Sequence, residues 1–370
     1  MDRLKDAVRR SRGMKKSARE QRRNINNIGM FDLSRGLLML FVVLGHSITL
    51  FFEYWEIEVE VSLLLLPILL GKVLTYGLLP VFFIMSGYGF RMQTMKKCAK
   101  NQARYLLKPY LYVAIIVTVA AVLKKLLLGR SVLDALRYQS FPFLLALPSE
   151  SKVPIGEWDT ASIGFMWFFV TLGLAWIVMN LIFQLKNEAL RFLIIAGLAV
   201  CGVQLPAYAF MPFCLAQVLC SIAYMYLGYR IKKARLLTRG TPKWMYAILV
   251  MIVIFIVPFG YIEVSQNVWK LNVLDYLASC AAGCLLFKTS VFLDRFTGKI
   301  ASFFRLLGKN SMYILCIHAV EYLVIPWEYA ERIMKGHYVL GFFAVLIARV
   351  LIIGVGCFVI RRIVRRKRKG

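Results

Sequence analysis

Residues 31–47 read FDLSRGLLMLFVVLGHS and begin a long, almost continuously apolar run near the start of the chain. Such a run is long enough to cross about 30 Å of hydrocarbon as a helix, and its apolar residues do not alternate as those of a barrel strand do. The chain repeats this pattern, which predicts ten membrane-spanning helices near residues 32–52, 63–90, 106–128, 163–185, 190–207, 211–230, 244–262, 272–292, 303–325 and 340–360. The second block carries Pro67, Lys72 and Pro80, and we expect a kink or a broken start there.

The composition supports a polytopic membrane protein and excludes an ordinary soluble enzyme. Apolar residues make up 60% of the 370 residues, while Lys and Arg number 47 against 19 Asp and Glu, which gives a formal net charge of +28. The charges lie between the apolar blocks. Most of the basic residues fall in the segments that are cytoplasmic if both termini are inside, whereas most acids fall on the other side, which is the positive-inside pattern. We therefore interpret the positive charge as a record of orientation and expect no nucleic-acid partner.

The chain divides into a membrane domain and two basic ends. We expect residues 1–29 to form a basic, disordered cytoplasmic tail, residues 30–361 the all-α membrane domain, and residues 362–370 a second basic cytoplasmic tail. The first apolar run has no cleavage signal, so we predict a multi-pass protein of a bacterial cytoplasmic membrane. The segment 129–162 is the sizeable outer loop and could cap a site. The eight Cys are scattered without a ligand motif, and we expect no metal.

The first predicted helix carries two ionisable residues on one face. Arg35 and His46 are eleven residues apart, about 20° from three full turns, and lie about 16 Å apart along the axis. Asp32, three residues before Arg35, can pair with it. One interpretation is that Arg35 extends to the membrane–water interface and that His46 is a structural residue hydrogen-bonded to a neighbouring helix. The other is a functional stripe with an imidazole near mid-membrane.

Other ionisable residues fall at a similar depth in other predicted spans. His318 would lie about 20 Å deep if its span enters near residue 305, and Glu321, one turn on, could orient it. Arg349 lies about 16 Å inside the last span, and Gln217 is at a similar depth in the sixth. A convergent polar layer of this kind marks a buried site or a pathway. The alternative is that the ionisable residues of the three helices each pair locally with a neighbour and form no common site.

Five segments, in order, resemble the acyltransferase family 3 of integral-membrane enzymes. The stretch at 31–47 is similar to the family's signature of Arg, ten residues and His. LLPVFFIMSGYGF (78–90) resembles its "PLFFFISGY" segment and MWFFVTLGLAWIV (166–178) its "WFL" helix start. YLGYRIKK (226–233) and LGKNSMYILCIH (307–318) resemble a helix end and the "LGxxSxYIxxxH" helix. The resemblance covers residues 30–360 and is nearest to sugar O-acetyltransferases of the fucose 4-O-acetylase-like branch.

The resemblance implies an acyl-CoA donor, most simply acetyl-CoA, reached from the cytoplasm, and a sugar, glycan or lipid-linked precursor of the envelope as acceptor. It also implies that Arg35 and His46 are essential. The family's paired-Arg pattern before the third helix is matched only loosely, by Arg104 and Lys108. We expect no appended hydrolase-like domain, so that the membrane part acts alone.

These expectations combine into a mechanistic hypothesis. His46 would be the general base for the acceptor hydroxyl. The coenzyme A phosphates would be held by basic residues at the inner surface, namely Arg35, Arg91, Lys97, Arg104 and Lys108. Second-tier candidates for acceptor or oxyanion contacts are His318, Ser86 and Tyr313, although Ser86 beside Gly87 could instead serve helix packing. An acyl-histidine route stays open.

Two other classes of function are compatible with the same residues. Midplane His, Glu and Arg groups also suit a proton-coupled transporter or flippase. Paired broken helices would favour transport, and only the second span has the sequence of an interrupted helix. A sensor or scaffold without chemistry would leave the Arg35–His46 stripe unexplained.

Overall fold

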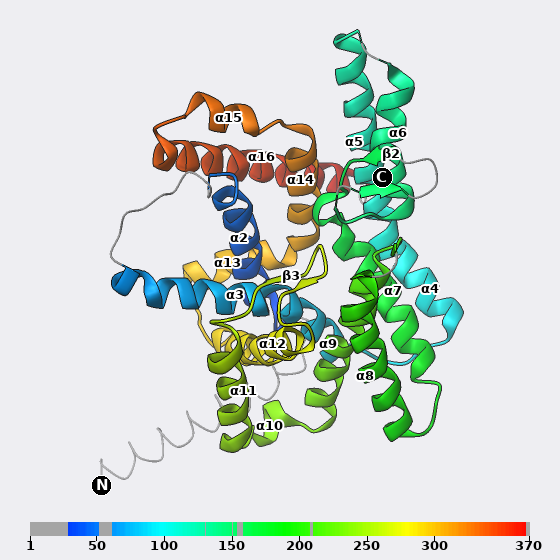
Figure 1. The fold of residues 1–370 in the computed structure, drawn as a ribbon, viewed down its shortest axis with the longest axis vertical. Helices are drawn as coiled ribbons and strands as arrows, with labels where there is room; N and C mark the ends of the chain where they lie inside the picture. The colour runs from blue at the N-terminus through cyan, green and yellow to red at the C-terminus, as the bar shows by residue number, and fades with distance from the viewer. Residues whose placement is uncertain are drawn as a thin grey trace.

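The computed structural model describes residues 29–51, 61–129, 131–149, 151–153, 158–207 and 210–367. The described chain is built almost wholly of helices (Figure 1). Its α-helices are α2 (Asp32–Ile48), α3 (Val61–Tyr88), α4 (Met95–Gln102), α5 (Lys108–Leu127), α6 (Val132–Leu145), α7 (Trp167–Ile182), α8 (Glu188–Gln204), α9 (Leu215–Lys233), α10 (Leu236–Arg239), α11 (Lys243–Ile256), α12 (Val273–Leu293), α13 (Lys299–Lys309), α14 (Ser311–Val324), α15 (Glu328–Ile333) and α16 (Tyr338–Lys367). Residues 1–28 of the expected basic tail lie outside the described residues.

The few other elements are short. A π-helical turn, η2 (Ala103–Leu107), joins α4 to α5, and two 3₁₀ turns are η3 (Gly164–Met166) and η4 (Leu205–Ala207). The strands form two antiparallel hairpins, β1 (Ser151–Val153) with β2 (Trp158–Thr160) and β3 (Ile262–Glu263) with β4 (Val268–Trp269).

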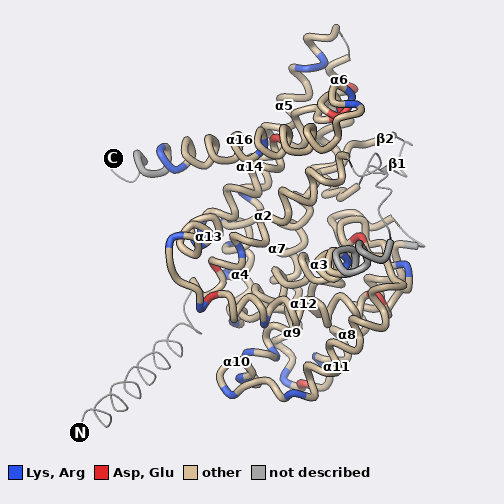
Figure 2. Tube along the Cα trace, turned by 90° about the vertical axis from the view of Figure 1, so that its left-hand side faces the viewer, with Lys and Arg blue, Asp and Glu red and all other residues tan. Residues whose placement is uncertain are grey.

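The protein is an all-α membrane protein, and each of the ten predicted blocks contains a helix. Within the described residues, five segments are long and apolar enough to cross a membrane: Leu70–Tyr88, Met95–Leu127, Gly164–Ile182, Val273–Leu293 and Tyr338–Ile363. Figure 2 shows Lys, Arg, Asp and Glu mostly at helix ends and connections, with long uncharged stretches between them. That distribution leaves the apolar helix surfaces free for lipid.

The ninth predicted span is not one helix. The chain breaks at Asn310, so that α13 runs across the view of Figure 1 and α14 turns nearly upright from its end. The block 303–325 carries Arg305, Lys309 and Asn310 in its first half, and α13 is amphipathic. The depth expected for His318 assumes one helix that enters near residue 305, whereas His318 follows seven residues after the start of α14.

Three other boundaries differ from those expected. The basic segment 91–108 is largely helical, because α4 and η2 precede α5 in one continuous helical segment of 33 residues, Met95–Leu127. The second block shows no break, since α3 runs through both prolines from Val61 to Tyr88. The last helix, α16, continues to Lys367, into the residues expected to form a terminal tail.

Glycines let two pairs of helices touch backbone to backbone. A Cβ added at Gly36 of α2 would overlap the backbone of Phe304 in α13, and one at Gly308 would overlap the backbone of Asp32. Gly87 of α3 stands in the same relation to Met225 of α9. Small residues serve membrane helices in this way because lipid offers no hydrophobic drive for association. The α2–α13 contact fixes the start of the helix that bears Arg35 and His46.

Replacing Gly36 by Val is therefore expected to destabilise the protein by roughly 1–3 kcal/mol, the usual range for an overpacked core. The measurement is thermal unfolding of purified protein in detergent. Gly197→Val is the control, because a Cβ at Gly197 of α8 meets nothing within 4 Å. Equal melting temperatures for the two variants would contradict the close α2–α13 contact.

A polar tether from Arg305, beside this contact, joins α13 to the end of α12. The Arg305 guanidinium Nη2 donates to the backbone oxygens of Asp294 at 2.7 Å and Phe296 at 2.9 Å, and lies 3.4 Å from the Asp294 carboxylate. Asp294 lies just beyond α12, where burial raises the pKa of its carboxyl group and the nearby Arg305 opposes that rise. The tether joins α12 to α13, which in turn packs on α2.

Candidate active site

His46 lies at the edge of a cavity of about 950 Å³. The cavity is bordered by parts of α2, α3, α14 and α16, and the segment 129–162 contributes residues of α6 and of the approach to η3 to its wall. Segment 129–162, which the sequence predicts to be an outer loop that could cap a site, therefore lines part of the cavity. It is held in place by Ser162 Oγ, which donates to Pro148 O at 2.7 Å and accepts from the Gly164 amide at 2.9 Å.

Aromatic rings pack around His46. Its ring centroid lies 4.5 Å from that of Phe165, 5.3 Å from Tyr322 and 5.6 Å from His318. Phe165 also stacks on His318 at 4.6 Å with an interplanar angle of 18°. Gly164 makes this possible, because its φ of +53° is a conformation that residues with a Cβ adopt at a cost. The turn at Gly164 thus places the Phe165 ring against both imidazoles.

Behind His46, a buried carboxylate joins three side chains. Glu321 Oε1 lies 2.5 Å from His318 Nδ1, and Glu321 Oε2 accepts a hydrogen bond from the Trp327 indole at 2.6 Å. His318 is fully buried and Glu321 is 3% exposed. When Nδ1–H of a neutral imidazole donates to a carboxylate, the ring's lone pair is on Nε2. His318 Nε2 has no hydrogen-bond partner among the described residues.

Arg349 provides the positive charge in this cluster. Its Nε lies 3.8 Å from Glu321 Oε1, and its Nη1 lies 3.4 Å from Ser47 Oγ on α2. The guanidinium also lies over the rings of Trp327 and Tyr322, at 5.1 and 5.7 Å from their centroids. Arg349 is fully buried yet lines the cavity, and its Nη2 has no hydrogen-bond partner in the described part of the chain. A buried charge needs such compensation, which the carboxylate and the two rings supply.

The structure brings together four of the residues selected from sequence, His46, His318, Glu321 and Arg349, from three helices (α2, α14 and α16). His46 and Arg349 border the cavity together with Tyr322. His318 and Glu321 lie behind these three residues. The arrangement can hold a proton acceptor at a cavity wall, backed by an imidazole whose orientation a carboxylate fixes.

Three other candidates lie outside this cluster. Ser86 accepts a hydrogen bond from Trp176 at 2.8 Å and belongs to the α3–α7 packing. Gln217 Nε2 donates to Ser265 O at 2.7 Å, so it supports the β3–β4 hairpin, whose Ser265 does line the cavity. Tyr313 is 36% exposed on α14 and does not line the cavity.

The expected coenzyme A ligands are not gathered at the cavity. Arg35 lies 3.4 Å from the Asp32 carboxylate, as the spacing predicts. Arg104 falls in the π-turn η2 and lies over the Tyr105 ring, and Lys108 lies over Tyr112. Within the described residues, none of the five cations lines the cavity, and Arg91, Lys97, Arg104 and Lys108 are exposed.

The sequence reasoning missed several contacts of the site. Trp327 donates to Glu321, a contact that the sequence analysis does not predict. Tyr322 lies one turn after His318 on α14, and that spacing could have identified it. Ser47 follows His46 directly. Phe165 could not be found from spacing, because its position depends on the turn at Gly164.

The model of the acyltransferase domain family matches residues 28–360, which include every residue of this cluster. Neither the comparison with curated proteins nor that with solved structures gives a match. Among the described residues, no group of three or more His, Cys, Asp or Glu could hold a metal ion.

Proposed function

Because the chain belongs to the acyltransferase domain family across residues 28–360, we propose that it transfers an acyl group, most simply acetyl, from acyl-CoA to a hydroxyl group of an envelope sugar, glycan or lipid-linked precursor. The observation that carries the proposal is His46 at the wall of a large cavity, backed by the His318–Glu321 pair. The narrower assignment, to sugar O-acetyltransferases of the fucose 4-O-acetylase-like kind in a bacterial cytoplasmic membrane, rests on the sequence resemblance.

In the proposed reaction, His46 takes the proton of the acceptor hydroxyl as its oxygen attacks the thioester carbonyl. The C–O bond forms, and a tetrahedral oxyanion results. The C–S bond then breaks, and the proton held by His46 goes to the departing thiolate, so that the products are the ester and free coenzyme A. Arg349 and Tyr322 line the same cavity, and their guanidinium and hydroxyl groups would stabilise the oxyanion.

His318 would act through His46 rather than on substrate. It lies behind Phe165 and His46 and does not line the cavity, while Glu321 fixes its ring. A neutral imidazole with its lone pair on Nε2 can accept a hydrogen bond or stabilise the imidazolium that forms at His46. We therefore assign His318 and Glu321 as positioning residues.

The polar part of the cavity wall suits a hydroxyl-rich acceptor. The outer segments contribute hydroxyl, amide and carboxylate side chains, among them Tyr138, Gln139, Ser162, Glu263 and Gln266. Sugars are bound by such groups together with aromatic faces. The charge pattern that predicts cytoplasmic termini puts these segments on the outer side of the membrane, and the acyl-CoA would reach the site from the inner side, past Arg35 and the basic 91–108 segment.

Transport is the second candidate, because a buried Arg–Glu pair beside an open cavity is also how proton-coupled carriers are built. One experiment separates the two. Purified protein in liposomes is supplied inside with labelled acetyl-CoA, and a panel of free and lipid-linked sugars is offered on either side. The proposal requires acceptor-dependent release of free coenzyme A together with a labelled ester. Accumulation of unmodified sugar without acetyl-CoA would establish transport instead.

A further inference from the structure

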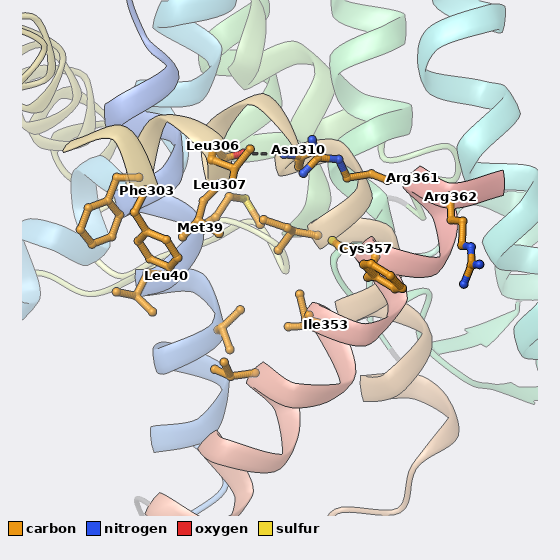
Figure 3. Close-up of a pocket in the computed structure, with 16 residues that line it drawn as sticks. Met39, Leu40, Phe303, Leu306, Leu307, Asn310, Ile353, Cys357, Arg361 and Arg362 are labelled. Carbon is orange, nitrogen blue, oxygen red and sulfur yellow. Dashed lines mark hydrogen bonds between the residues drawn. The ribbon is translucent and has the colours of Figure 1, made fainter. Parts of the chain in front are cut away.

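A second cavity, of about 900 Å³, lies between α2, α13, α14 and α16 (Figure 3). Its wall is almost wholly apolar, with Leu40 from α2, Phe303 and Leu307 from α13, Ile314 from α14 and Ile353 from α16. Met39 borders both cavities, but His46 belongs only to the first. This groove is therefore separate from the proposed reaction site.

The length of the groove matches one leaflet of a bilayer. Along α16 it extends from Val350 to Arg362, a rise of twelve residue steps and thus about 18 Å of helix. The hydrocarbon core of a bilayer is about 30 Å thick, so that length covers the half of the α16 span nearer its C-terminal end. A straight acyl chain of one leaflet would fit along it.

One end of the groove is positively charged. Arg361 and Arg362 lie there, at the end of the candidate span Tyr338–Ile363, and Figure 3 shows their guanidinium groups at this end, beyond Cys357. Asn310 lies at the same end, where its side-chain amide donates to Leu306 O. No Asp or Glu lines the described groove. Arginine binds phosphate oxygens in a paired geometry, which makes this end suited to an anionic headgroup.

We propose that this groove binds an anionic phospholipid, with one acyl chain along the apolar wall and its phosphate at Arg361 and Arg362. With the termini cytoplasmic, the lipid comes from the cytoplasmic leaflet, where anionic lipids meet basic residues near the surface. The proposal does not depend on acyl transfer, because it uses none of the residues assigned to that reaction.

Gly354 offers a way to block the groove without disturbing the fold. It lies on the groove wall of α16, and a Cβ built on it meets nothing within 4 Å. A leucine at this position would project into the space that the acyl chain occupies. Gly197 of α8 is a matched control, since it is equally open and lies outside the groove.

The test is native mass spectrometry of the delipidated full chain in detergent, titrated with phosphatidylglycerol or with phosphatidylcholine of the same acyl chains. We expect the anionic lipid to bind more tightly, by about 5-fold for each arginine. The variant Arg361→Gln/Arg362→Gln should lose that preference. Gly354→Leu should weaken binding of both lipids, because it removes the space for the chain.

The controls keep charge and size effects apart. Arg235→Gln/Arg239→Gln removes two exposed charges near α10, outside the groove, and Gly197→Leu adds the same side chain elsewhere. Both should bind as the unmodified protein does. Equal affinity for the two lipids, the same loss in the control variants, or undiminished binding to Gly354→Leu would overturn the proposal. A dimer that Gly354→Leu dissociates would mean that a second copy of the chain occupies the groove.

Discussion

Replacing His46 by alanine is expected to lower the rate of acyl transfer by about 10²–10⁴-fold, which is the usual contribution of a general base. His46 is the histidine that lines the main cavity, and its ring is held between Phe165, Tyr322 and His318. The measurement is release of coenzyme A by proteoliposomes supplied with acetyl-CoA and an acceptor. The KM of the His46→Ala variant for acetyl-CoA should change little, because the substitution impairs proton transfer and not binding of the donor.

His337→Ala is the matched control, since His337 is exposed in the connection between α15 and α16 and lies outside the cavity. It should retain full activity. Thermal unfolding of both variants checks that neither has lost its fold. If His46→Ala remained folded and retained near-normal turnover, the assignment of His46 as the base would be wrong.

The second large effect is expected on stability, from the buried pair Glu321 and Arg349. Replacing Arg349 by methionine leaves the Glu321 carboxylate buried without its cation, and breaking a buried ion pair in this way costs about 3–5 kcal/mol. Glu321→Gln leaves Arg349 uncompensated in the same manner. Thermal unfolding in detergent should therefore show a large fall in Tm for each single variant.

The double variant Glu321→Gln/Arg349→Met distinguishes a coupled pair from two independent residues. It removes both charges, so its loss should be clearly smaller than the sum of the two single losses. Arg332→Met, at an exposed position on α15, serves as the control and should leave Tm nearly unchanged. Additive losses would mean that the 3.8 Å separation does not represent an energetic pair.

The sequence predicts that each of the ten apolar blocks contains a helix, and it predicts the residues of the polar layer, because both follow from local rules. Apolar blocks long enough to span a membrane locate the helices, and the cost of burying ionisable groups singles out His46, His318, Glu321 and Arg349. The i, i+3 spacing also predicted the contact of His318 with Glu321 correctly.

What the sequence did not predict depends on backbone direction at particular residues. The block 303–325 has the length of one span, although Gly308 and Asn310 are residues that commonly end helices and could have indicated the break. The orientation of Phe165 follows from the turn at Gly164, and that of Trp327 from the chain leaving α14. The five basic residues expected to bind coenzyme A do not line a common cavity among the described residues. Their charge alone does not specify in which direction each helix surface faces.

The break at Asn310 also determines where the chain can change length. Because α14 begins at Ser311, a residue inserted in α13 shifts that helix along α2 but leaves the phase of α14 free to be reset at the break. A residue inserted between Ser311 and His318 has no such relief, and it would turn His318 and Glu321 by about 100° away from Phe165 and Arg349. We therefore expect the segment 311–318 not to tolerate a change in length, whereas the length of the amphipathic helix α13 can vary.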